Sequence, residues 1–447
     1  MIRTLLKKLT YTQLIAISFL IVILLGACLL CLPQSTRDHS STPFLHALFT
    51  ATSATCVTGL IVYDTYTHWS LFGQIVILAL IQIGGLGFMT IVTMLRRFFK
   101  RNISLSERKL IMQTSGTLQL NSSTPMLSRI FLGTLFFEGA GTIILSFCFC
   151  PQMGLWEGIY NALFHSVSAF CNAGFDILGK YGEFSSLTTY VNNVPVTLTI
   201  GALIVIGGLG FMVWDDIAKN GFHFKKYEFH TKIVLTTTTT LILLGWGLFF
   251  IFEYNASMSH LTLGEKVLAS LFQSITPRTA GFNSVDINQL SQSGYLLTTV
   301  LMLIGGSPGS TAGGIKTTTF AVLIMSTIAA ARQKGAITLF KRKLRSELLV
   351  QASAIFMVYL TALGIGTLII CAAEPFMLED VIFECVSAIG TVGLSCSISS
   401  MAAPITHIIL TLLMYFGRIG GLSIMCAIME PKNKVQISRP EGEIVVG

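Results

Sequence analysis

Long apolar stretches, separated by short polar segments, cover most of this chain. About 20 apolar residues span the hydrocarbon core of a bilayer as a helix. By this measure the pattern predicts eight full spans, the sixth of them interrupted by polar residues and glycines. They cover residues 12–32, 71–95, 128–150, 194–214, 231–253, 294–330, 348–373 and 404–428. The hydropathy pattern therefore predicts an all-α polytopic membrane protein.

Four shorter apolar segments lie between the two spans of each successive pair. They are near residues 43–54, 156–169, 263–275 and 377–387. Each is too short to cross the bilayer, so each is predicted to be a re-entrant helix covered by protein or by a water-filled cavity. Two start signals agree, because Thr42-Pro43 opens the first segment and Thr262-x-x-Glu265 forms a capping box before the third. The partially negative C-terminal ends of such helices would favour a cation in a pore.

Each short segment leads into a loop with one central glycine. The same lead-in residues precede each loop: a Phe, a polar residue directly after it, and a Ser or Thr four residues after the Phe. They are Phe49/Thr50/Ser53, Phe164/His165/Ser168, Phe272/Gln273/Thr276 and Phe383/Glu384/Ser387. The loops recur at intervals of 107–115 residues and read Val57-Thr58-Gly59-Leu60, Asn172-Ala173-Gly174-Phe175, Thr279-Ala280-Gly281-Phe282 and Thr391-Val392-Gly393-Leu394. This recurrence predicts four pseudo-repeats of span, pore helix, filter loop and span around one central pore. The boundaries are 1–100, 101–220, 221–335 and 336–430, with a cytoplasmic tail at 431–447.

The fourth loop is similar to the Thr-Val-Gly-Tyr-Gly filter of potassium channels, whose backbone carbonyls replace the hydration shell of the ion. Glycine suits such a loop because it adopts positive φ and leaves the pore open. The alternative is a set of ordinary extracellular turns, and the fourfold recurrence argues against it. The candidate ion-binding residues are Val57, Thr58, Gly59, Asn172, Ala173, Gly174, Thr279, Ala280, Gly281, Thr391, Val392 and Gly393.

The second span of the third repeat contains a polar, glycine-rich stretch that cannot stay helical in lipid. It is predicted to unwind at mid-membrane beneath its own filter loop. The stretch resembles a phosphate-binding P-loop, but Ile315 stands before Lys316 and no soluble sheet precedes it, so nucleotide binding is rejected. Its residues are Gly305, Gly306, Ser307, Pro308, Gly309, Ser310, Thr311, Ala312, Gly313, Gly314, Ile315 and Lys316.

Arg418 lies inside the last span, where an arginine costs roughly 2.5–3.5 kcal/mol on insertion scales. The predicted partners are carbonyls freed by the broken helix at 305–314 or the carboxylate of Glu138. Arg418 is either a structural link between helices or an electrostatic latch under the filter. Asp64 and Asp176 follow two filter glycines, with Asn283 and Ser395 at the matching places. These carboxylates either concentrate cations at the mouth or serve as turn residues.

The charges set the predicted orientation. Of 29 Lys and Arg, 23 lie on the side of the N-terminus, so both termini are predicted to be cytoplasmic. Arg37, Lys180, Lys266 and Arg278 are assigned to the outer side, and Lys316 and Arg418 to membrane depth. This asymmetry accounts for the net charge of +8 without nucleic acid. The basic segments 96–127 and 331–347 face either lipid headgroups or a docking subunit.

Other function classes find little support in the sequence. The eight His are dispersed, and Cys28-x-x-Cys31 has no second ligand pair, so an enzyme or metal centre is not expected. A coupled transporter with inverted repeats is disfavoured, because all four repeats have the same orientation by charge.

Taken together, the four single-glycine loops, the broken helix at 305–316 and Arg418 resemble the Trk/Ktr/HKT superfamily of potassium transporters, in particular its KtrB-type subunits. The resemblance covers essentially the whole chain, including the tail Arg439–Gly447. It implies gated K⁺ uptake across the bacterial plasma membrane, with K⁺ held at the four loops and Gly305–Lys316 and Arg418 acting as the gate. Asn172 departs from the Thr of other repeats, and some plant relatives that pass Na⁺ carry Ser where this chain has Gly59.

The same resemblance implies the partners. KtrB-type proteins form homodimers and dock on a cytoplasmic ring of RCK-type nucleotide-binding regulatory subunits (KtrA-like). ATP or ADP would therefore bind only the partner, and no cofactor is expected in this chain. Uptake in the Ktr branch is often stimulated by Na⁺. The alternative function is a less selective Na⁺/K⁺ channel or transporter, because one glycine per repeat offers few ordered carbonyl sites.

Overall fold

The structure is a computed structural model, and it describes residues 11–87, 123–333 and 337–420. The regular secondary structure of these residues is helical, apart from one small hairpin of β1 (Thr338–Leu339) and β2 (Arg342–Lys343). The predicted all-α fold is confirmed. The tail 431–447 and most of the basic segment 96–127 lie outside the described residues.

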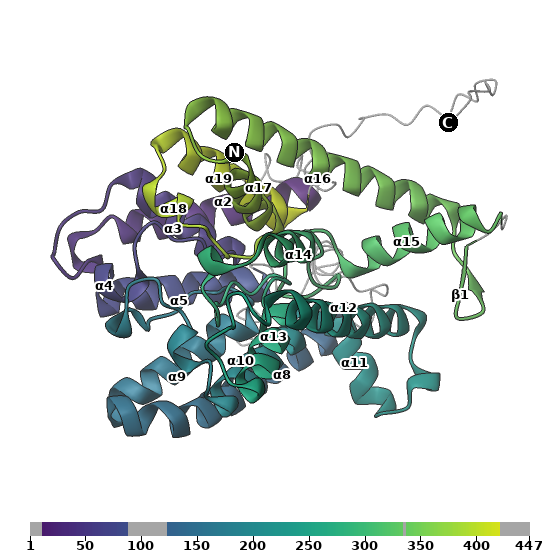
Figure 1. The fold of residues 1–447 in the computed structure, drawn as a ribbon, viewed down its shortest axis with the longest axis horizontal. Helices are drawn as coiled ribbons and strands as arrows, with labels where there is room; N and C mark the ends of the chain where they lie inside the picture. Colours follow the sequence, from purple (N-terminus) through teal and green to yellow (C-terminus); the bar gives the residue numbers. More distant parts are fainter. Residues whose placement is uncertain (1–10, 88–122, 334–336, 421–447) are drawn as a thin grey trace.

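Four helices in the described ranges are long and apolar enough to cross a membrane. They are α2 (Tyr11–Leu30), α8 (Ser123–Met153), α12 (Phe229–Glu253) and α16 (Ser346–Ala373). Figure 1 shows α16 as a long continuous helix along one edge of the molecule. Large apolar side chains on these helices, such as Phe136, Ile251 and Leu368, stay exposed, as expected for surfaces that face lipid.

The second helix of each predicted pair is shorter. These helices are α5 (Leu71–Leu86), α10 (Val194–Leu209), α14 (Gln292–Leu303) and α19 (Pro404–Ile419). The predicted break in the sixth span is confirmed, because residues 304–316 are not helical and α15 (Thr317–Ala331) begins after them. The ends of the spans 71–95 and 404–428 extend past Gly87 and Gly420, outside the described residues.

The continuous span predicted at 194–214 is wrong. The chain bends by 96° between α10 and α11 (Phe211–Asn220). The cause is Gly210, whose φ of 93° no helix accommodates. The freed N–H of Phe211 donates instead to the carbonyl of Gly309, a residue of the broken stretch far along the chain. This long-range bond stabilises the bend.

The four predicted short helices are present within a few residues of their predicted ends. They are α3 (Phe44–Cys56), α9 (Leu155–Phe170), α13 (Leu263–Ile275) and α17 (Leu378–Gly390). The capping box of Thr262 and Glu265 at the start of α13 is confirmed, with the Glu265 carboxylate 2.8 Å from the Thr262 N–H. The lead-in residues Phe49, Phe164 and Phe383 are completely buried, and Phe272 is nearly so.

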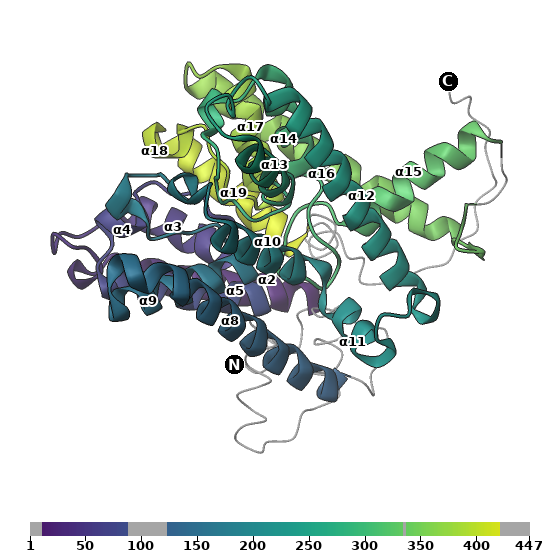
Figure 2. The same ribbon diagram turned by 60° about the horizontal axis from the view of Figure 1, so that its bottom comes forward.

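The short helices pack in a closed order. Each lies against the long helix before it: α3 on α2, α9 on α8, α13 on α12 and α17 on α16. The side-by-side packing of α8 and α9 is clear in Figures 1 and 2. Each short helix also contacts the second helix of the preceding pair: α9 on α5, α13 on α10, α17 on α14 and, closing the ring, α3 on α19. The loops that follow the short helices therefore meet at the centre.

Candidate functional site

The four glycine loops come together backbone to backbone. A Cβ atom built on Gly59 would lie 2.5 Å from the carbonyl oxygen of Ala173, and one on Gly174 would lie 2.5 Å from that of Ala280. A Cβ on Gly281 would meet the carbonyl of Val392, and one on Gly393 that of Thr58, at still closer range. The four contacts thus run in one direction and close a ring. Only glycine fits at all four points, because real Cβ atoms never approach so closely.

The backbone of these loops alternates in conformation. The four glycines have φ of 96°, 70°, 75° and 92°, and the residues two positions earlier also have positive φ. These earlier residues are Val57, Asn172, Thr279 and Thr391, at 51–73°. Positive φ is uncommon for any residue with a side chain and an outlier for β-branched ones, and such strain concentrates at functional sites. The residues between, Thr58, Ala173, Ala280 and Val392, do not share it.

The hydroxyl of each lead-in Ser or Thr fastens its loop to its own short helix. In the first and fourth loops, Ser53 and Ser387 accept from the N–H of Gly59 and Gly393, each at 3.0 Å. In the second and third loops, the hydroxyl donates at 2.7 Å to the carbonyl just after the glycine, from Ser168 to Phe175 and from Thr276 to Phe282. The lead-in found in the sequence therefore holds the strained loops in place.

All four glycines line one hollow of about 560 Å³. Asp176, Glu183, Asp286, Asn283 and Ser395 also line it, so its rim is polar and acidic. Three of the four positions that follow the loop glycines thus line this hollow, which we call the mouth hollow.

Asp64, the fourth, serves a different role from Asp176. Its carboxylate accepts from the N–H groups of Tyr66 (3.0 Å) and Thr67 (2.8 Å), capping the short helix α4 (Thr65–His68). It also accepts from Phe184 at 3.2 Å and is buried outside the mouth hollow. Of the two roles considered for it, the turn role holds. Asp176 accepts from the Leu178 N–H at 3.1 Å and also lines the mouth hollow.

The carboxyl of Asp176 has a raised pKa. Burial raises it most, the hydrogen bond from the Leu178 N–H opposes this and the charge of nearby Asp64 adds to it, and together they bring the pKa of Asp176 to about 7. The carboxyl is therefore neutral below about pH 7 and negative above it. We expect uptake at subsaturating K⁺ to rise roughly two- to tenfold as the outer pH increases from 6 to 8, because the negative charge concentrates cations. Asp176→Asn should remove this rise, while Glu379→Gln, in the first turn of α17, should keep it; an unchanged pH profile in Asp176→Asn would contradict the role.

The broken stretch 304–316 lies directly against the loops. A Cβ on Gly314 would lie 3.0 Å from the carbonyl of Gly390, and one on Gly313 would collide with the side chain of Thr391. The Thr311 hydroxyl lies 3.2 Å from the carbonyl of Phe170, next to the second loop. One further bond attaches the stretch to α10, from Ser307 N to Gly208 O (2.9 Å). Two others lie within the stretch, from Gly305 N to Ile315 O (2.8 Å) and from Lys316 Nζ to Ala312 O (2.6 Å).

Arg418 joins this stretch to α5. Its guanidinium donates to the carbonyls of Thr311 and Gly84, and to that of Gly85 at 3.3 Å. Gly84 and Gly85 lie in the last turn of α5, where helix carbonyls lack intrahelical partners and carry partial negative charge. The expected pairing of Arg418 with a carbonyl of the broken stretch is confirmed, and its expected pairing with Glu138 is wrong.

Glu138 belongs to a separate buried group. Its carboxyl accepts from Gln82 at 3.3 Å and lies 3.9 Å from the sulfur of Cys171, which precedes the second loop. The sequence could not pair these residues, since α5, α8 and the end of α9 supply one each.

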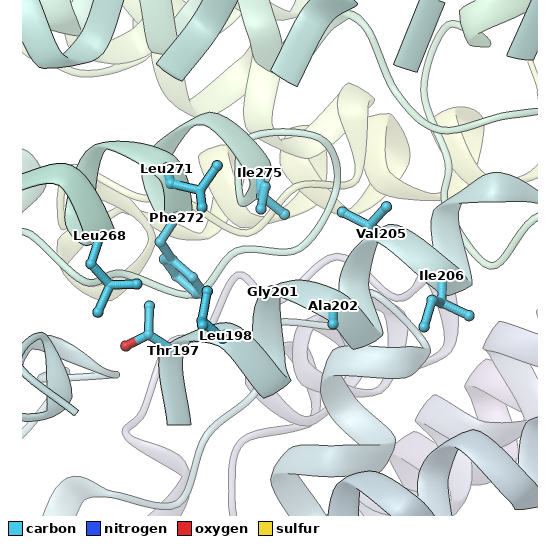
Figure 3. A pocket seen from close by; sticks show the side chains of 10 residues that line it. All are labelled: Thr197, Leu198, Gly201, Ala202, Val205, Ile206, Leu268, Leu271, Phe272 and Ile275. Atoms are coloured by element: carbon cyan, nitrogen blue, oxygen red, sulfur yellow. The ribbon is translucent and has the colours of Figure 1, made fainter. Parts of the chain in front are cut away.

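Not every hollow belongs to this site. An apolar groove of about 330 Å³ lies between α10 and α13. Figure 3 shows its lining, which includes Leu198, Val205, Leu271 and Phe272, with Thr197 as the polar member. A cation gains no ligands there, so we exclude the groove from an ion path.

The described residues hold no group of three or more His, Cys, Asp or Glu able to bind a metal ion. The ring of loops itself contains closely packed backbone carbonyls, such as those of Ala173 and Ala280 beside Gly59 and Gly174. Oxygen ligands of this kind suit weakly hydrated alkali cations.

Comparison with known proteins agrees with this architecture. A family model for cation transport proteins, TrkH, matches residues 7–436. The chain is 38% identical to the potassium/sodium uptake protein NtpJ of Enterococcus hirae, over 99% of this chain and 98% of that protein. It is also 38% identical to the Ktr system potassium uptake protein B of Bacillus subtilis, over 98% and 97% respectively.

A solved structure shares the fold. The potassium transporter TrkH from Vibrio parahaemolyticus superimposes with a TM-score of 0.70, at 17% identity, over 92% of this chain and 84% of that one. The resemblance inferred from sequence motifs is confirmed. The chain is a multi-pass membrane protein that belongs to the TrkH family of cation transport proteins, and within it the chain is similar over nearly its whole length to KtrB-type subunits.

Proposed function

We propose that this protein takes up K⁺ through a central pore, as the ion-translocating subunit of a Ktr-type system. The observation that carries the proposal is the closed ring of four glycine loops, in which each glycine abuts the carbonyl of the next loop. Relatives along the whole chain are named as potassium uptake proteins, which supports K⁺ as the ion.

The filter would consist of the twelve residues named from the sequence, from Val57–Gly59, Asn172–Gly174, Thr279–Gly281 and Thr391–Gly393. Alternation of positive and ordinary φ along a loop turns successive carbonyls to one side, where they replace the water around an ion. The closed packing order of α3, α9, α13 and α17 supports four pseudo-repeats, with the boundaries given above, around one pore.

The stretch 305–316 would act as the gate below this filter. Its contacts with Gly390, Thr391 and Phe170 support this role, because it lies close to the second and fourth loops. Arg418 would hold the gate closed, because its guanidinium donates hydrogen bonds both to the Thr311 carbonyl of the stretch and to the Gly84 carbonyl at the end of α5. Opening would require these carbonyls to exchange the guanidinium for water or another donor.

The assembly would include further chains. The name of the Bacillus subtilis relative refers to a Ktr system, which supports a multi-subunit assembly. We propose a homodimer on a ring of RCK-type subunits that bind ATP or ADP, with both termini in the cytoplasm of a bacterial cell and uptake stimulated by Na⁺. The hairpin β1–β2 offers exposed Lys341, Arg342 and Lys343 for such a partner or for lipid headgroups.

A second candidate is a less selective Na⁺/K⁺ pathway. The specific observation in its favour is the name of the Enterococcus hirae relative, which includes sodium. Glycine at position 59 favours K⁺, because a side chain there would displace the carbonyl of Ala173.

Gly59→Ser tests the filter. We expect the K⁺ over Na⁺ permeability ratio to fall at least about tenfold, since losing roughly 1.4 kcal/mol of discrimination gives that factor. The ratio is measured by competition of K⁺ and Na⁺ against ⁸⁶Rb⁺ uptake in liposomes. Gly247→Ser is the matched control, because a Cβ at Gly247 meets nothing within 4 Å. A ratio unchanged in Gly59→Ser would show that this loop is not the filter.

A further inference from the structure

The side chain of Asn172, the first residue of the second loop, reaches outside its own loop. Only 1% of the residue is exposed, and its amide lies between the third loop and the broken stretch. One end of the amide lies 3.2 Å from the hydroxyl of Thr279, and the other end lies 3.3 Å from the hydroxyl of Thr311. Both of these threonines are completely buried. The amide is therefore part of a buried polar network that joins two loops to the proposed gate.

This network joins the same three segments in either orientation of the amide. With its oxygen toward Thr311, the amide accepts from that hydroxyl and donates to the hydroxyl of Thr279. With its oxygen toward Thr279, it accepts from Thr279 and donates to the carbonyls of Phe170 (3.3 Å) and Ile204 (3.2 Å). The Thr311 hydroxyl then remains bonded beside the second loop through the Phe170 carbonyl, at 3.2 Å.

The first and fourth loops have no such link to the stretch. Their residues at the place of Asn172 are Val57, which has no polar side-chain group, and Thr391, whose buried hydroxyl has no hydrogen-bond partner in the described residues. The stretch packs against Thr391 at Gly313, which has no side chain to bond with it. Among the described residues, the hydrogen bonds between the stretch and the loops therefore run to the second loop and the residue before it.

We propose that Asn172 is a positioning residue through which the gate stretch controls the affinity of the filter for K⁺. This inference rests on the function proposed above. A buried network that loses one partner is left with unsatisfied polar groups at low dielectric, which is costly. When the stretch moves aside, the Thr311 hydroxyl leaves the network, so the second and third loops lose a support of their ion-coordinating backbone. K⁺ therefore binds more weakly when the gate is open, and by linkage a bound K⁺ favours the closed arrangement.

Such coupling differs from the action of a gate that only blocks the path. A simple plug alters the maximal rate of uptake, because it alters the fraction of open pores, and it leaves the affinity of the filter unchanged. The coupling instead alters the K⁺ concentration that gives half-maximal uptake. The two quantities are obtained together from the initial rate of uptake into liposomes at a series of outer K⁺ concentrations, with ⁸⁶Rb⁺ as tracer.

Two substitutions break the link at different points. Thr311→Val removes the hydroxyl but keeps the carbonyl that accepts from Arg418, and Asn172→Gly removes the amide while suiting the φ of 59° at this position. We expect each to raise the half-saturating K⁺ concentration at least about threefold. The double variant should show no further rise, because both substitutions break one network.

Conservative and distant substitutions separate this effect from a loss of structure. Thr311→Ser keeps the hydroxyl and should restore most of the affinity that Thr311→Val loses. Thr134→Val is the matched control, because it removes a buried hydroxyl of α8 that has no partner in the described residues. It should keep the wild-type half-saturating concentration. Melting temperatures check folding, and Thr279→Val, which removes the hydroxyl at the other end of the amide, takes the place of Asn172→Gly if that variant does not fold.

The coupling is overturned if Thr311→Val changes only the maximal rate, since the stretch is then a plain gate. It is also overturned if the two rises multiply in the double variant, because Asn172 and Thr311 then act separately. In both cases saturable K⁺ uptake continues and the proposed function stands. Absence of uptake by the folded wild type and by all folded variants would overturn the proposed function together with this inference, so the two failures are distinguishable.

Discussion

Gly393→Ala will reduce K⁺ uptake at least about tenfold and will leave the protein folded. The added methyl group would collide with the carbonyl of Thr58 and lie 2.9 Å from the Cα of Gly59. Both obstacles are backbone atoms of a neighbouring loop, so they cannot swing away as a side chain would. The φ of 92° adds about 1–2 kcal/mol of strain for any residue with a Cβ. Displacing one carbonyl of the ring by these forces should disturb ion coordination, and roughly 1.4 kcal/mol suffices for a tenfold effect.

The measurement is the initial rate of ⁸⁶Rb⁺ uptake into liposomes, with the melting temperature as a check on folding. The matched control is Gly364→Ala in α16, an exposed position where a Cβ meets nothing within 4 Å. This control should transport at the wild-type rate. Wild-type uptake by a folded Gly393→Ala protein would mean that the ring of loops does not coordinate the ion.

Deletion of Pro308–Thr311 will increase K⁺ flux about tenfold or more. The deletion removes two hydrogen-bond acceptors: the Thr311 carbonyl, which accepts from Arg418, and the Gly309 carbonyl, which accepts from the Phe211 N–H. Hydrogen bonds to charged groups contribute about 1.5–3 kcal/mol each, enough to shift a closed–open equilibrium by an order of magnitude. Arg418→Gln should act in the same direction but less strongly, because the rest of the stretch stays pinned by Ser307 and Lys316.

The matched control for Arg418→Gln is Lys219→Gln. Lys219 pairs with Asp215 at the exposed end of α11 and has no hydrogen bond to the broken stretch. Both variants lose one positive charge, so a difference between them reports the latch and not the net charge. Unchanged flux in a well-folded deletion variant would reduce residues 305–316 to a structural kink.

The loops could be predicted from the sequence because their chemistry is local. Each loop has a glycine that needs positive φ. In the first and fourth loops a serine hydroxyl stands six residues before this glycine, at Ser53 and Ser387, and such a local pattern can be recognised wherever it recurs. The same holds for the broken helix, since Gly305–Gly314 contains too many helix breakers to remain regular in lipid. Because the motif recurs four times along the chain, it is far more specific than any one short copy.

Features set by distant contacts could not be predicted. Residues 194–214 have the pattern of one apolar span, and the bond that stabilises the bend at Gly210 comes from Gly309, a residue far along the chain. The sequence offered two partners for Arg418, and only packing shows that carbonyls of α5 and of the broken stretch, not Glu138, accept its hydrogen bonds.

The most direct test of the central claim is ⁸⁶Rb⁺ uptake into liposomes that contain the purified chain, with excess K⁺ or Na⁺ as competitor. The Pro308–Thr311 deletion is measured in parallel, so that a gate closed without its partner does not conceal the pathway. The ring of glycine loops predicts uptake that K⁺ blocks and Na⁺ does not. Equal block by Na⁺ and K⁺, or no uptake by either folded protein, would contradict a K⁺-selective pore.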